Sequence, residues 1–417
     1  MMTSSSNYEL QTCDIFCKVI DNYGDIGVCW RLARQLAGEH GLQVRLWVDD
    51  LGSFAKLCPE IDVAQESQRC RGVEVCLWGK LFPEVQPAGL VIEAFACKLP
   101  QSYIEAMASQ QRSVWINLEY LSAEDWVHGC HRLPSPHPNL PLTKYFFFPG
   151  FTKQTGGLLL ERSLLARRDE FRNNAAQQQA FWRSIGMKMP GAETLKISLF
   201  GYENAALHGL FDTWANGAQA VLCLVPEGRI LPQVEQYFED VGRDSSRRSQ
   251  SAGMNPDLRN YSCGNLQVRV LPFVEQDRYD ELLWACDVNF VRGEDSCVRA
   301  QWAAKPFIWQ IYPQHDTVHW GKLQAFLNLY SAPLSSRTSE AVQALWKAWN
   351  KGNGAGQAAS TGSGQAWPAF AAVRGELECH AQHWARQLAE NNLVLNLLDF
   401  SREIGRMRAI KIEGQQT

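Results

Sequence analysis

Two aspartates lie close together near the start of the chain, in the segment D-N-Y-G-D-I-G at residues 21–27. An apolar run before this segment predicts a strand, and the amphipathic run after it predicts a helix. Asp21 and Asp25 therefore belong to the first strand-to-helix turn, which in an open α/β sheet lies at the carboxyl ends of the strands, where ligands bind. Gly24 and Gly27 allow a tight backbone path close to a substrate. This placement favours a functional site.

The two aspartates also have a purely structural interpretation. Asp21 could cap the turn and Asp25 could cap the helix, each contributing about 1 kcal/mol. A dinucleotide site is disfavoured, because the G-x-G-x-x-G pattern is absent and two carboxylates would repel a pyrophosphate at this helix start.

A second polar group, R-G-E-D-S at residues 292–296, follows an apolar run and precedes a helical pattern. Backbone N–H groups at the helix start, with the Ser296 hydroxyl and Arg292, would form a cradle for a diphosphate that needs no metal. Glu294 or Asp295 could then hold sugar or ribose hydroxyls. A plain capping role for this segment stays open.

Two further segments end predicted strands, F-G-Y at 200–202 and L-P-F-V-E-Q at 271–276. Both would meet the R-G-E-D-S segment at one edge of a parallel sheet. Phe200 or Tyr202 could stack on a base, and the backbone from Phe273 to Gln276 could read a pyrimidine edge. Any of these aromatic side chains could equally belong to the core.

The composition limits the class of protein. The 417 residues, 46% of them hydrophobic, suit two globular domains of about 150–200 residues each. A net charge of −4 gives no field that would hold a nucleic-acid backbone. A signal peptide and a membrane-spanning apolar run are both absent from the sequence, so we expect a cytoplasmic protein without membrane contact.

Metal binding is not expected from the sequence. The 13 cysteines are irregularly spaced without a C-x-x-C pair, and several lie in apolar runs, so we expect reduced core residues. His315 and His319 could share a helical face, but paired histidines at a surface or a cap are commoner. A D-x-D triplet is also absent. We therefore expect no metal and no cofactor.

The organisation along the chain indicates two similar halves. Short apolar runs alternate with amphipathic stretches, which is typical of βαβ units and parallel sheets. G-M-K-M-P-G-A-E at 186–193 predicts a boundary, giving a first domain at 1–185 and a second at 190–367. The helical pattern within about 368–417 could return to brace the first domain. The whole predicts an α/β protein with the GT-B glycosyltransferase fold, two facing Rossmann-like domains.

Two segments rich in small or polar residues interrupt this pattern, at 243–265 and at 351–366. Their composition predicts mobile loops without a chemical role.

Residues 15–36 and 292–314, which contain the two polar groups above, are specific enough to resemble a known family. I-E-A-F-A-C at 92–97 and N-L-E-Y-L-S-A-E at 117–124 extend the match over nearly the whole chain. Together these segments resemble the bacterial elongation factor P arginine rhamnosyltransferases, the EarP family. The resemblance implies a metal-independent enzyme that transfers L-rhamnose from dTDP-β-L-rhamnose to one arginine of elongation factor P, inverting the anomeric centre.

The resemblance also implies roles for individual residues. Asp25 corresponds to the proposed general base and Asp21 to the other acidic residue of its loop, with Glu294 as a further catalytic candidate. The remaining donor-side positions are Asn22, Tyr23 and Gly24 in the first loop, and Phe200, Tyr202, Phe273, Val274, Gln276, Arg292, Gly293, Asp295 and Ser296 at the nucleotide site.

A mechanism follows as a hypothesis. A guanidinium group has a pKa above about 12, so Asp21 and Asp25 would orient it and Asp25 would take its proton as the C–N bond forms. The helix start, with Arg292 or Arg299, would meet the charge on the leaving dTDP. The alternatives are an inverting GT-B transferase with another nucleotide sugar or a small-molecule acceptor, and a non-catalytic nucleotide-sugar-binding protein.

Overall fold

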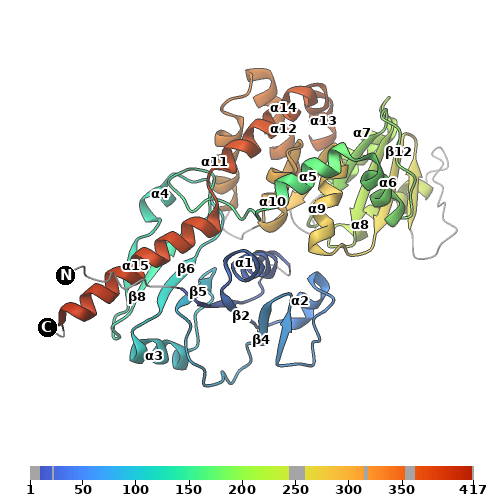
Figure 1. Cartoon of the computed structure of the whole chain (residues 1–417). Helices are drawn as coiled ribbons and strands as arrows, with labels where there is room; N and C mark the ends of the chain where they lie inside the picture. The colour runs from blue at the N-terminus through green and yellow to red at the C-terminus, as the bar shows by residue number, and fades with distance from the viewer. Residues whose placement is uncertain (1–9, 21–22, 244–258, 314–317, 353–361, 416–417) are drawn as a thin grey trace. The chain divides into compact units, whose positions relative to one another are not determined.

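A computed structural model describes residues 10–20, 23–243, 259–313, 318–352 and 362–415 (Figure 1). The chain forms two compact units, one made of Met1–Arg162 with Gln387–Thr417 and the other of Ser163–Arg386. Each unit is built on a mostly parallel sheet with helices packed against it. The predicted α/β class with two parallel-sheet domains is therefore confirmed.

Within the described residues, the first unit carries an eight-stranded sheet in the order β3-β4-β2-β1-β5-β6-β8-β7. The pairs β3–β4 and β7–β8 are antiparallel, and the other neighbours run parallel. Its strands are β1 (Thr12–Cys17), β2 (Gln43–Val48), β3 (Ser67–Cys70), β4 (Val73–Leu77), β5 (Leu90–Ala94), β6 (Val114–Leu118), β7 (Pro134–Pro136) and β8 (Thr143–Phe147), and its helices are α1 (Gly24–His40), α2 (Leu51–Leu57), α3 (Gln101–Gln110), α4 (Trp126–Cys130) and α15 (Leu393–Gln415).

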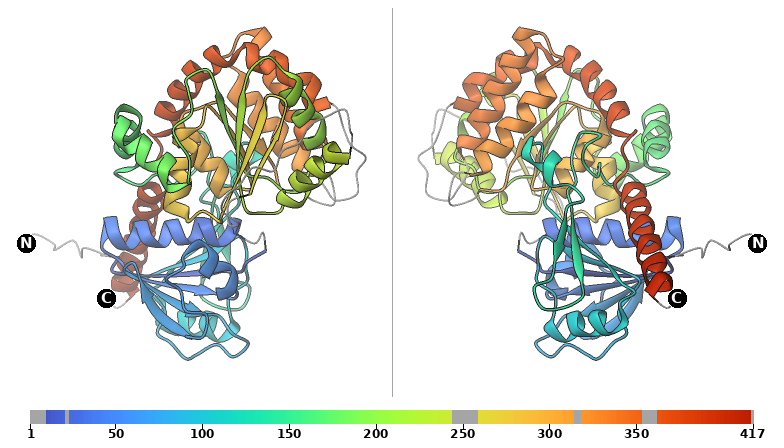
Figure 2. Two further views of the ribbon diagram at one scale, coloured as in Figure 1. Left: turned by 90° about the vertical axis from the view of Figure 1, so that its right-hand side faces the viewer. Right: turned by 90° about the vertical axis from the view of Figure 1, so that its left-hand side faces the viewer.

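Alternate residues of the central strands cover the two faces of this sheet, since successive side chains of a strand point to opposite sides. Phe16 and Trp115 lie in one buried cluster with Tyr103 and Met107 of α3. Figure 2 shows α1 along the opposite face of the sheet from α3. The α1 side is closed by a helix that is buried on all faces from Asp25 to Ala33, including Trp30 and Leu32.

The last helix returns to the first unit, as the sequence predicted. Phe400 of α15 packs edge-on against Tyr145 of β8, with ring centroids 5.5 Å apart, and also contacts Phe147. The link before α15 pairs with the same unit, because Leu158 donates its N–H to the carbonyl of Asn391 at 3.2 Å. These contacts fix the C-terminal segment to strand β8 and to the chain at Leu158.

The second unit carries, among its described residues, a six-stranded sheet in the order β11-β12-β10-β9-β13-β14. Only the β11–β12 pair is antiparallel. Its strands are β9 (Leu195–Leu199), β10 (Val221–Pro226), β11 (Asn260–Cys263), β12 (Leu266–Leu271), β13 (Val288–Arg292) and β14 (Phe307–Gln310), and its helices are α5 (Leu164–Asn173), α6 (Ala175–Ser184), α7 (Leu207–Asn216), α8 (Leu231–Arg243), α9 (Gln276–Ala285), α10 (Asp295–Ala303), α11 (Val318–Ser331), α12 (Ser336–Lys351), α13 (Gly362–Ala372) and α14 (Arg374–Leu388).

The predicted domain boundaries at 185 and 368 were wrong. The second unit begins at Ser163, because α5 and α6 pack on α9: Phe171 contacts Trp284 with ring centroids 5.8 Å apart. It extends to Arg386, because Trp384 of α14 donates a 2.6 Å hydrogen bond to Gln301 of α10. The Gly- and Pro-containing stretch 186–193 is therefore a connection inside the second unit.

The two predicted loops are shorter than expected. Residues 244–258 and 353–361 lie outside the described residues, but Asn260–Cys263 form β11 and pair with β12. Gly362 to Ala366 belong to α13. A polar sequence at a sheet edge and a Gly/Ala-rich helix start both resemble a loop in composition alone.

The cysteines fit the predicted reduced core, since all 13 are free thiols and all but Cys130 and Cys379 are buried. None of the helices in the described ranges has the length and apolar character needed to cross a membrane.

Candidate functional site

The turn after β1 holds Asp25 in a fixed position. Asp25 lies in the first turn of α1 and is 4% exposed. Its carboxylate accepts the backbone N–H of Ile20 at 2.8 Å. The helix is capped at Tyr23 without a side-chain hydrogen bond, so Asp25 does not act as the N-cap residue. The carboxylate instead closes the loop between strand and helix, at the end of α1 where the helix dipole favours a negative charge.

The same loop is anchored a second time. Asp49, which follows β2, accepts the N–H of Val19 at 2.9 Å. Two carboxylates thus hold consecutive backbone amides, and Ile20 remains 66% exposed between them. Gly24 opens α1, and Tyr23 is half-buried beside it. Asp21 and Asn22, the other predicted residues of this loop, lie outside the described residues.

The buried thiol of Cys17 lies behind the loop. A hydrogen bond with Cys29, then burial, then the charge of Asp25 raise the pKa of Cys17 well above its ordinary value. Cys17 therefore stays protonated at neutral pH, and no second negative charge competes with the Asp25 carboxylate from that position.

The neighbouring strand β5 ends in strained backbone at the same sheet edge, because β1 and β5 run parallel. Phe95, Ala96 and Lys98 adopt positive φ values of 55°, 53° and 57°, each of which costs an L-residue roughly 1 kcal/mol. Phe95 stacks on Tyr120, which follows β6, with centroids 4.6 Å apart. Sequence reasoning matched this segment to a family without assigning it a role, since no residue type signals such a backbone.

Glu93 stabilises this strained segment. It is 2% exposed and accepts hydrogen bonds from the Trp115 indole at 3.1 Å, the Lys144 ammonium at 3.0 Å and the Lys98 backbone N–H at 3.2 Å. The carboxylate is thereby neutralised by Lys144 and fully used in positioning the end of β5.

In the second unit, the turn after β13 folds tightly on itself. Gly293 adopts φ 56°, and Glu294 stands at the N-cap of α10. The Ser296 hydroxyl accepts the N–H of Arg292 at 3.0 Å and donates to the carbonyl of the same residue. The Trp309 indole donates to the Gly293 carbonyl at 2.7 Å. These bonds fix the R-G-E-D-S backbone before any ligand binds.

Arg292 lies over the two predicted aromatic residues. Its guanidinium is 4.6 Å from the ring centroid of Phe200 and 4.4 Å from that of Tyr202. Tyr202 is 2% exposed, so its ring serves Arg292 and is not open for base stacking, whereas Phe200 is half-buried. Cation–π contacts of this kind orient a guanidinium without removing its charge.

The loop after β12 meets the same turn. Gln276 opens α9, is 5% exposed, and donates its amide to the Asp295 carboxylate at 3.3 Å. Phe273 and Val274 are half-buried in this loop. The structure therefore brings the predicted residues of segments 271–276 and 292–296 together, with Phe200 and Tyr202 joined through Arg292.

Arg299 does not have the predicted role of a free cation. It is 1% exposed and forms a two-pronged ion pair with Asp280 of α9, with both N–O distances 2.7 Å. The pair ties α10 to α9 behind the turn. A further buried group, Tyr279, has its pKa raised by burial, so its hydroxyl is neutral. The positive charge near the turn is that of Arg292.

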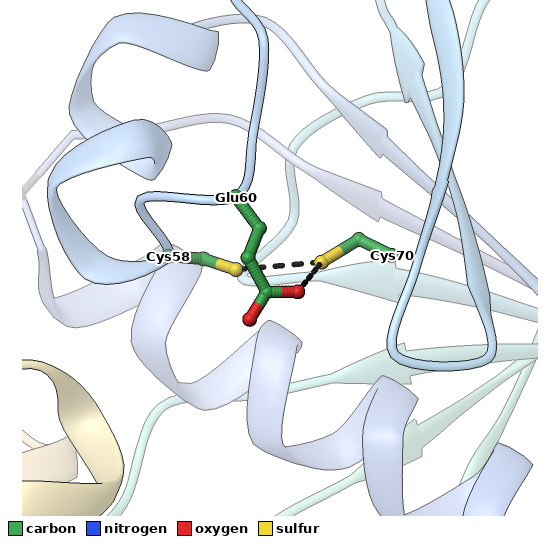
Figure 3. A group of neighbouring side chains, drawn as sticks. All are labelled: Cys58, Glu60 and Cys70. Carbon is green, nitrogen blue, oxygen red and sulfur yellow. Dashed lines mark hydrogen bonds between the residues drawn. The ribbon is translucent and has the colours of Figure 1, made fainter.

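One group of side chains in the described ranges could hold a metal ion, formed by Cys58, Glu60 and Cys70 of the first unit (Figure 3). None of the three belongs to the two turns above. His315, of the predicted histidine pair, lies outside the described residues, and His319 is buried in α11.

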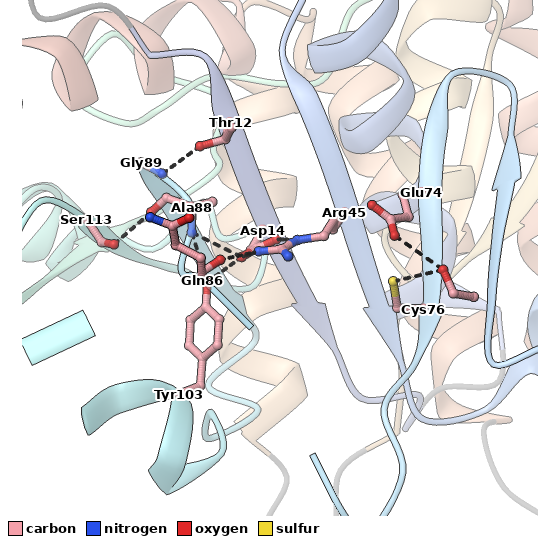
Figure 4. Close-up of polar contacts among 11 residues, drawn as sticks. Thr12, Asp14, Arg45, Glu74, Cys76, Gln86, Ala88, Gly89, Tyr103 and Ser113 are labelled. Atoms are coloured by element: carbon pink, nitrogen blue, oxygen red, sulfur yellow. Dashed lines mark hydrogen bonds and ion pairs between the residues drawn. The ribbon is translucent and has the colours of Figure 1, made fainter. Parts of the chain in front are cut away.

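A buried carboxylate at the other end of β1 is purely structural. Asp14 is fully buried and forms a two-pronged pair with Arg45, with both distances 2.6 Å (Figure 4). The Tyr103 hydroxyl and the Ala88 N–H also donate to it. Arg45 reaches on to the Gln86 carbonyl at 2.7 Å. Asp14 therefore joins β1, β2 and the start of β5, and all its charge is compensated.

Residues 13–402 match the model of a protein family that is described as "Elongation-Factor P (EF-P) rhamnosyltransferase EarP". It is 50% identical over 398 residues to a protein-arginine rhamnosyltransferase of Pseudomonas putida, covering 94% of this chain and 98% of the relative. It is 46% identical to one of Pseudomonas aeruginosa, covering 93% and 98%, and 34% identical to one of Neisseria meningitidis, covering 90% and 93%.

Solved structures show the same family and fold. A structure that describes the structural basis for EarP-mediated arginine glycosylation of translation elongation factor EF-P is 38% identical in sequence, with a TM-score of 0.62 over 94% of this chain and 99% of that one. A glycosyltransferase from Rickettsia africae, 8% identical with a TM-score of 0.50 over 96% and 99%, shares the fold alone. The fold is that of the GT-B glycosyltransferases, and the chain belongs to the EarP family of elongation factor P rhamnosyltransferases.

Proposed function

We propose that this protein transfers L-rhamnose from dTDP-β-L-rhamnose to one arginine side chain of elongation factor P, inverts the anomeric centre, acts in the cytoplasm, and uses no metal ion or cofactor in the transfer. Family membership and the activity for which the relatives are named support the reaction class. The observation that carries the chemistry is the buried, fixed carboxylate of Asp25 at the carboxyl edge of the first sheet.

The acceptor side begins with a problem of protonation. A guanidinium has a pKa above about 12 and no free lone pair. Removing a proton from it before the attack is therefore costly. In the proposed step Asp21 and Asp25 hold the guanidinium by charge-assisted hydrogen bonds, which orients one nitrogen toward the sugar. The backbone bond from Ile20 fixes Asp25 while leaving its negative charge in place.

In the proposed step the arginine nitrogen attacks the anomeric carbon on the side opposite the diphosphate, and the carbon–oxygen bond to dTDP breaks. The nitrogen's proton passes to the Asp25 carboxylate as the C–N bond forms. The leaving dTDP carries the electron pair of the broken bond.

The donor side is proposed at the turn after β13. The N–H groups at the start of α10 and the guanidinium of Arg292 would meet the charge that develops on the diphosphate. Glu294 would steady the sugar, and Asp295 with the 273–276 loop would hold the nucleoside. The fixed backbone of this turn reduces the reorganisation that the reaction requires.

The test is the intact mass of purified elongation factor P after incubation with this protein and dTDP-β-L-rhamnose. We expect a single added deoxyhexose with the wild type and with Asp399→Asn, which removes an exposed carboxylate of the same unit. Asp25→Asn should add almost none, while its amide oxygen can still accept the Ile20 N–H.

Three other outcomes identify the alternatives. Transfer from a different nucleotide sugar would correct the donor, and donor binding without any change in elongation factor P would correct the acceptor. Binding of dTDP with no turnover of any donor would make the chain a nucleotide-sugar-binding protein and overturn the proposed reaction.

A further inference from the structure

Three side chains of the first unit, Cys58, Glu60 and Cys70, point toward one another (Figure 3). Cys58 is the C-cap residue of α2, and Glu60 follows it by two positions. Cys70 is the last residue of β3 and precedes a tight hairpin turn in which Arg71 and Gly72 have φ 46° and 85°. The end of a helix and an edge hairpin thus supply the three groups.

The distances match the edges of a metal-centred tetrahedron. The two sulfur atoms are 3.5 Å apart, and the Cys70 sulfur is 3.4 Å from Oε2 of Glu60. All three possible ligand atoms lie within 4.8 Å of one another. Zinc at about 2.3 Å from sulfur and about 2.0–2.2 Å from oxygen places neighbouring ligands roughly 3.4–3.8 Å apart. Small side-chain adjustments would therefore admit the ion.

Arg71 prepares the carboxylate for this role. Its Nε and Nη2 donate to Oε1 of Glu60 at 2.9 and 2.7 Å, which directs Oε2 toward the sulfurs. Outer partners of this kind orient metal ligands and tune their basicity. Two thiolates, one carboxylate, one divalent ion and the Arg71 guanidinium sum to zero charge, so the occupied group leaves no uncompensated charge beside the buried sulfurs.

We propose that Cys58, Glu60 and Cys70 bind a thiophilic divalent ion of the zinc class, with a water molecule as the fourth ligand. Both sulfurs are buried, at 0% and 4% exposure, whereas the Glu60 side chain is 55% exposed, so the water would lie on the Glu60 side. On binding, two thiol protons pass to solvent as two metal–sulfur bonds form, and no electron is transferred.

The role of the ion is structural. It fastens the edge hairpin β3–β4 to the end of α2, two elements that the chain joins through the segment between Glu60 and Ser67. An ion bound by the folded state alone stabilises that state by mass action. The site is independent of the proposed transfer, because none of its residues belongs to the two turns.

The experiment uses the full chain, reduced and stripped with a chelator, and titrated with Co²⁺ as a spectroscopic probe of thiolate ligation. Wild type should bind one equivalent with a thiolate charge-transfer band, release it to Zn²⁺, and melt at a higher temperature with Zn²⁺. Cys379→Ser, which removes an exposed free cysteine, should behave identically.

Variants of the site separate the ligand roles. Cys70→Ser should weaken binding by at least about 100-fold, and Arg71→Ala by about 10–100-fold, the range for outer-shell partners. If Cys70→Ser fails to fold, Glu60→Gln and Arg71→Ala, both altered at the surface, still report on the site.

Two results would overturn the proposal. Equal Co²⁺ binding by wild type, Glu60→Gln and Arg71→Ala would assign the metal to other thiols. A reduced wild type that binds no Co²⁺ but closes a Cys58–Cys70 disulfide with peroxide, which takes the two electrons and is seen as the loss of both thiol hydrogen atoms in one linked peptide pair, would make the two thiols a redox pair.

Discussion

The turns after β1 and after β13 each lie at the carboxyl edge of a mostly parallel sheet, but their chemistry is opposite. After β1, backbone N–H groups of Val19 and Ile20 bond to Asp49 and Asp25, so the turn positions negative charge. After β13, the turn holds the cation of Arg292 over two aromatic rings.

In the proposed reaction, this difference lets one topology serve two kinds of substrate. A backbone amide fixes a carboxylate and preserves its charge, which suits binding and deprotonation of a guanidinium. Aromatic faces fix a guanidinium and preserve its charge, which suits a diphosphate. In the proposed reaction the first turn serves the arginine acceptor and the second the dTDP donor.

The largest effect is expected from removing the charge of the first turn. Asp25→Asn should lower kcat by about 10²–10⁴-fold, the range for loss of a general base. The affinity for dTDP should not change, because Asp25 belongs to the acceptor side of the comparison. Single-turnover mass spectrometry of elongation factor P measures the first quantity and calorimetry the second. Near-normal turnover with both substrates bound would show that Asp25 is not the base.

The next effect concerns the support of the second turn. Asp280→Ala leaves Arg299 without its buried partner and should lower the free energy of unfolding by about 3–5 kcal/mol. The double variant Asp280→Leu with Arg299→Met should recover most of this loss, because apolar residues of similar volume replace both charges. Urea unfolding measures both, and a single variant as stable as wild type would mean that the pair is not buried in solution.

The central strands and the two turns compared above could be predicted from the sequence. β1, β9 and β13 were predictable because apolar runs are long and buried on both faces, and both turns follow from their ends. The edge strands β3 and β7 were not predicted, since S-Q-R-C and P-S-P have no apolar alternation.

The features that the sequence did not predict depend on contacts between residues far apart in the chain. The first boundary depends on the packing of Phe171 against Trp284, 113 positions later in the chain, which no local pattern shows. Arg299 was expected beside the diphosphate, but its charge is used by Asp280 across two helices. The thiols of Cys58 and Cys70 meet only because the chain after α2 returns as strand β3 and brings its last residue back to the end of that helix.

A smaller effect is expected from the hydroxyl that closes the second turn. Ser296→Ala removes the acceptor for the Arg292 N–H, a buried group, and should cost about 1–3 kcal/mol of stability. Ser331→Ala is the matched control, because this buried hydroxyl only donates to the Leu327 carbonyl within a helix. Thermal unfolding compares the two. Equal losses would mean that the Ser296 hydroxyl does not hold the turn.

The smallest effects should come from the nucleoside side of the second turn. Asp295→Ala and Phe273→Ala should each weaken dTDP binding by about tenfold, or roughly 1.4 kcal/mol, the size of one or two lost polar or stacking contacts. Asp295 also loses its bond from Gln276, so Gln276→Ala separates that indirect contribution. Calorimetric titration with dTDP measures all three against Asp25→Asn, which should bind like wild type. If Asp295→Ala and Phe273→Ala also bind like wild type, the nucleotide lies elsewhere in the second unit, and the contrast between the two turns concerns structure alone.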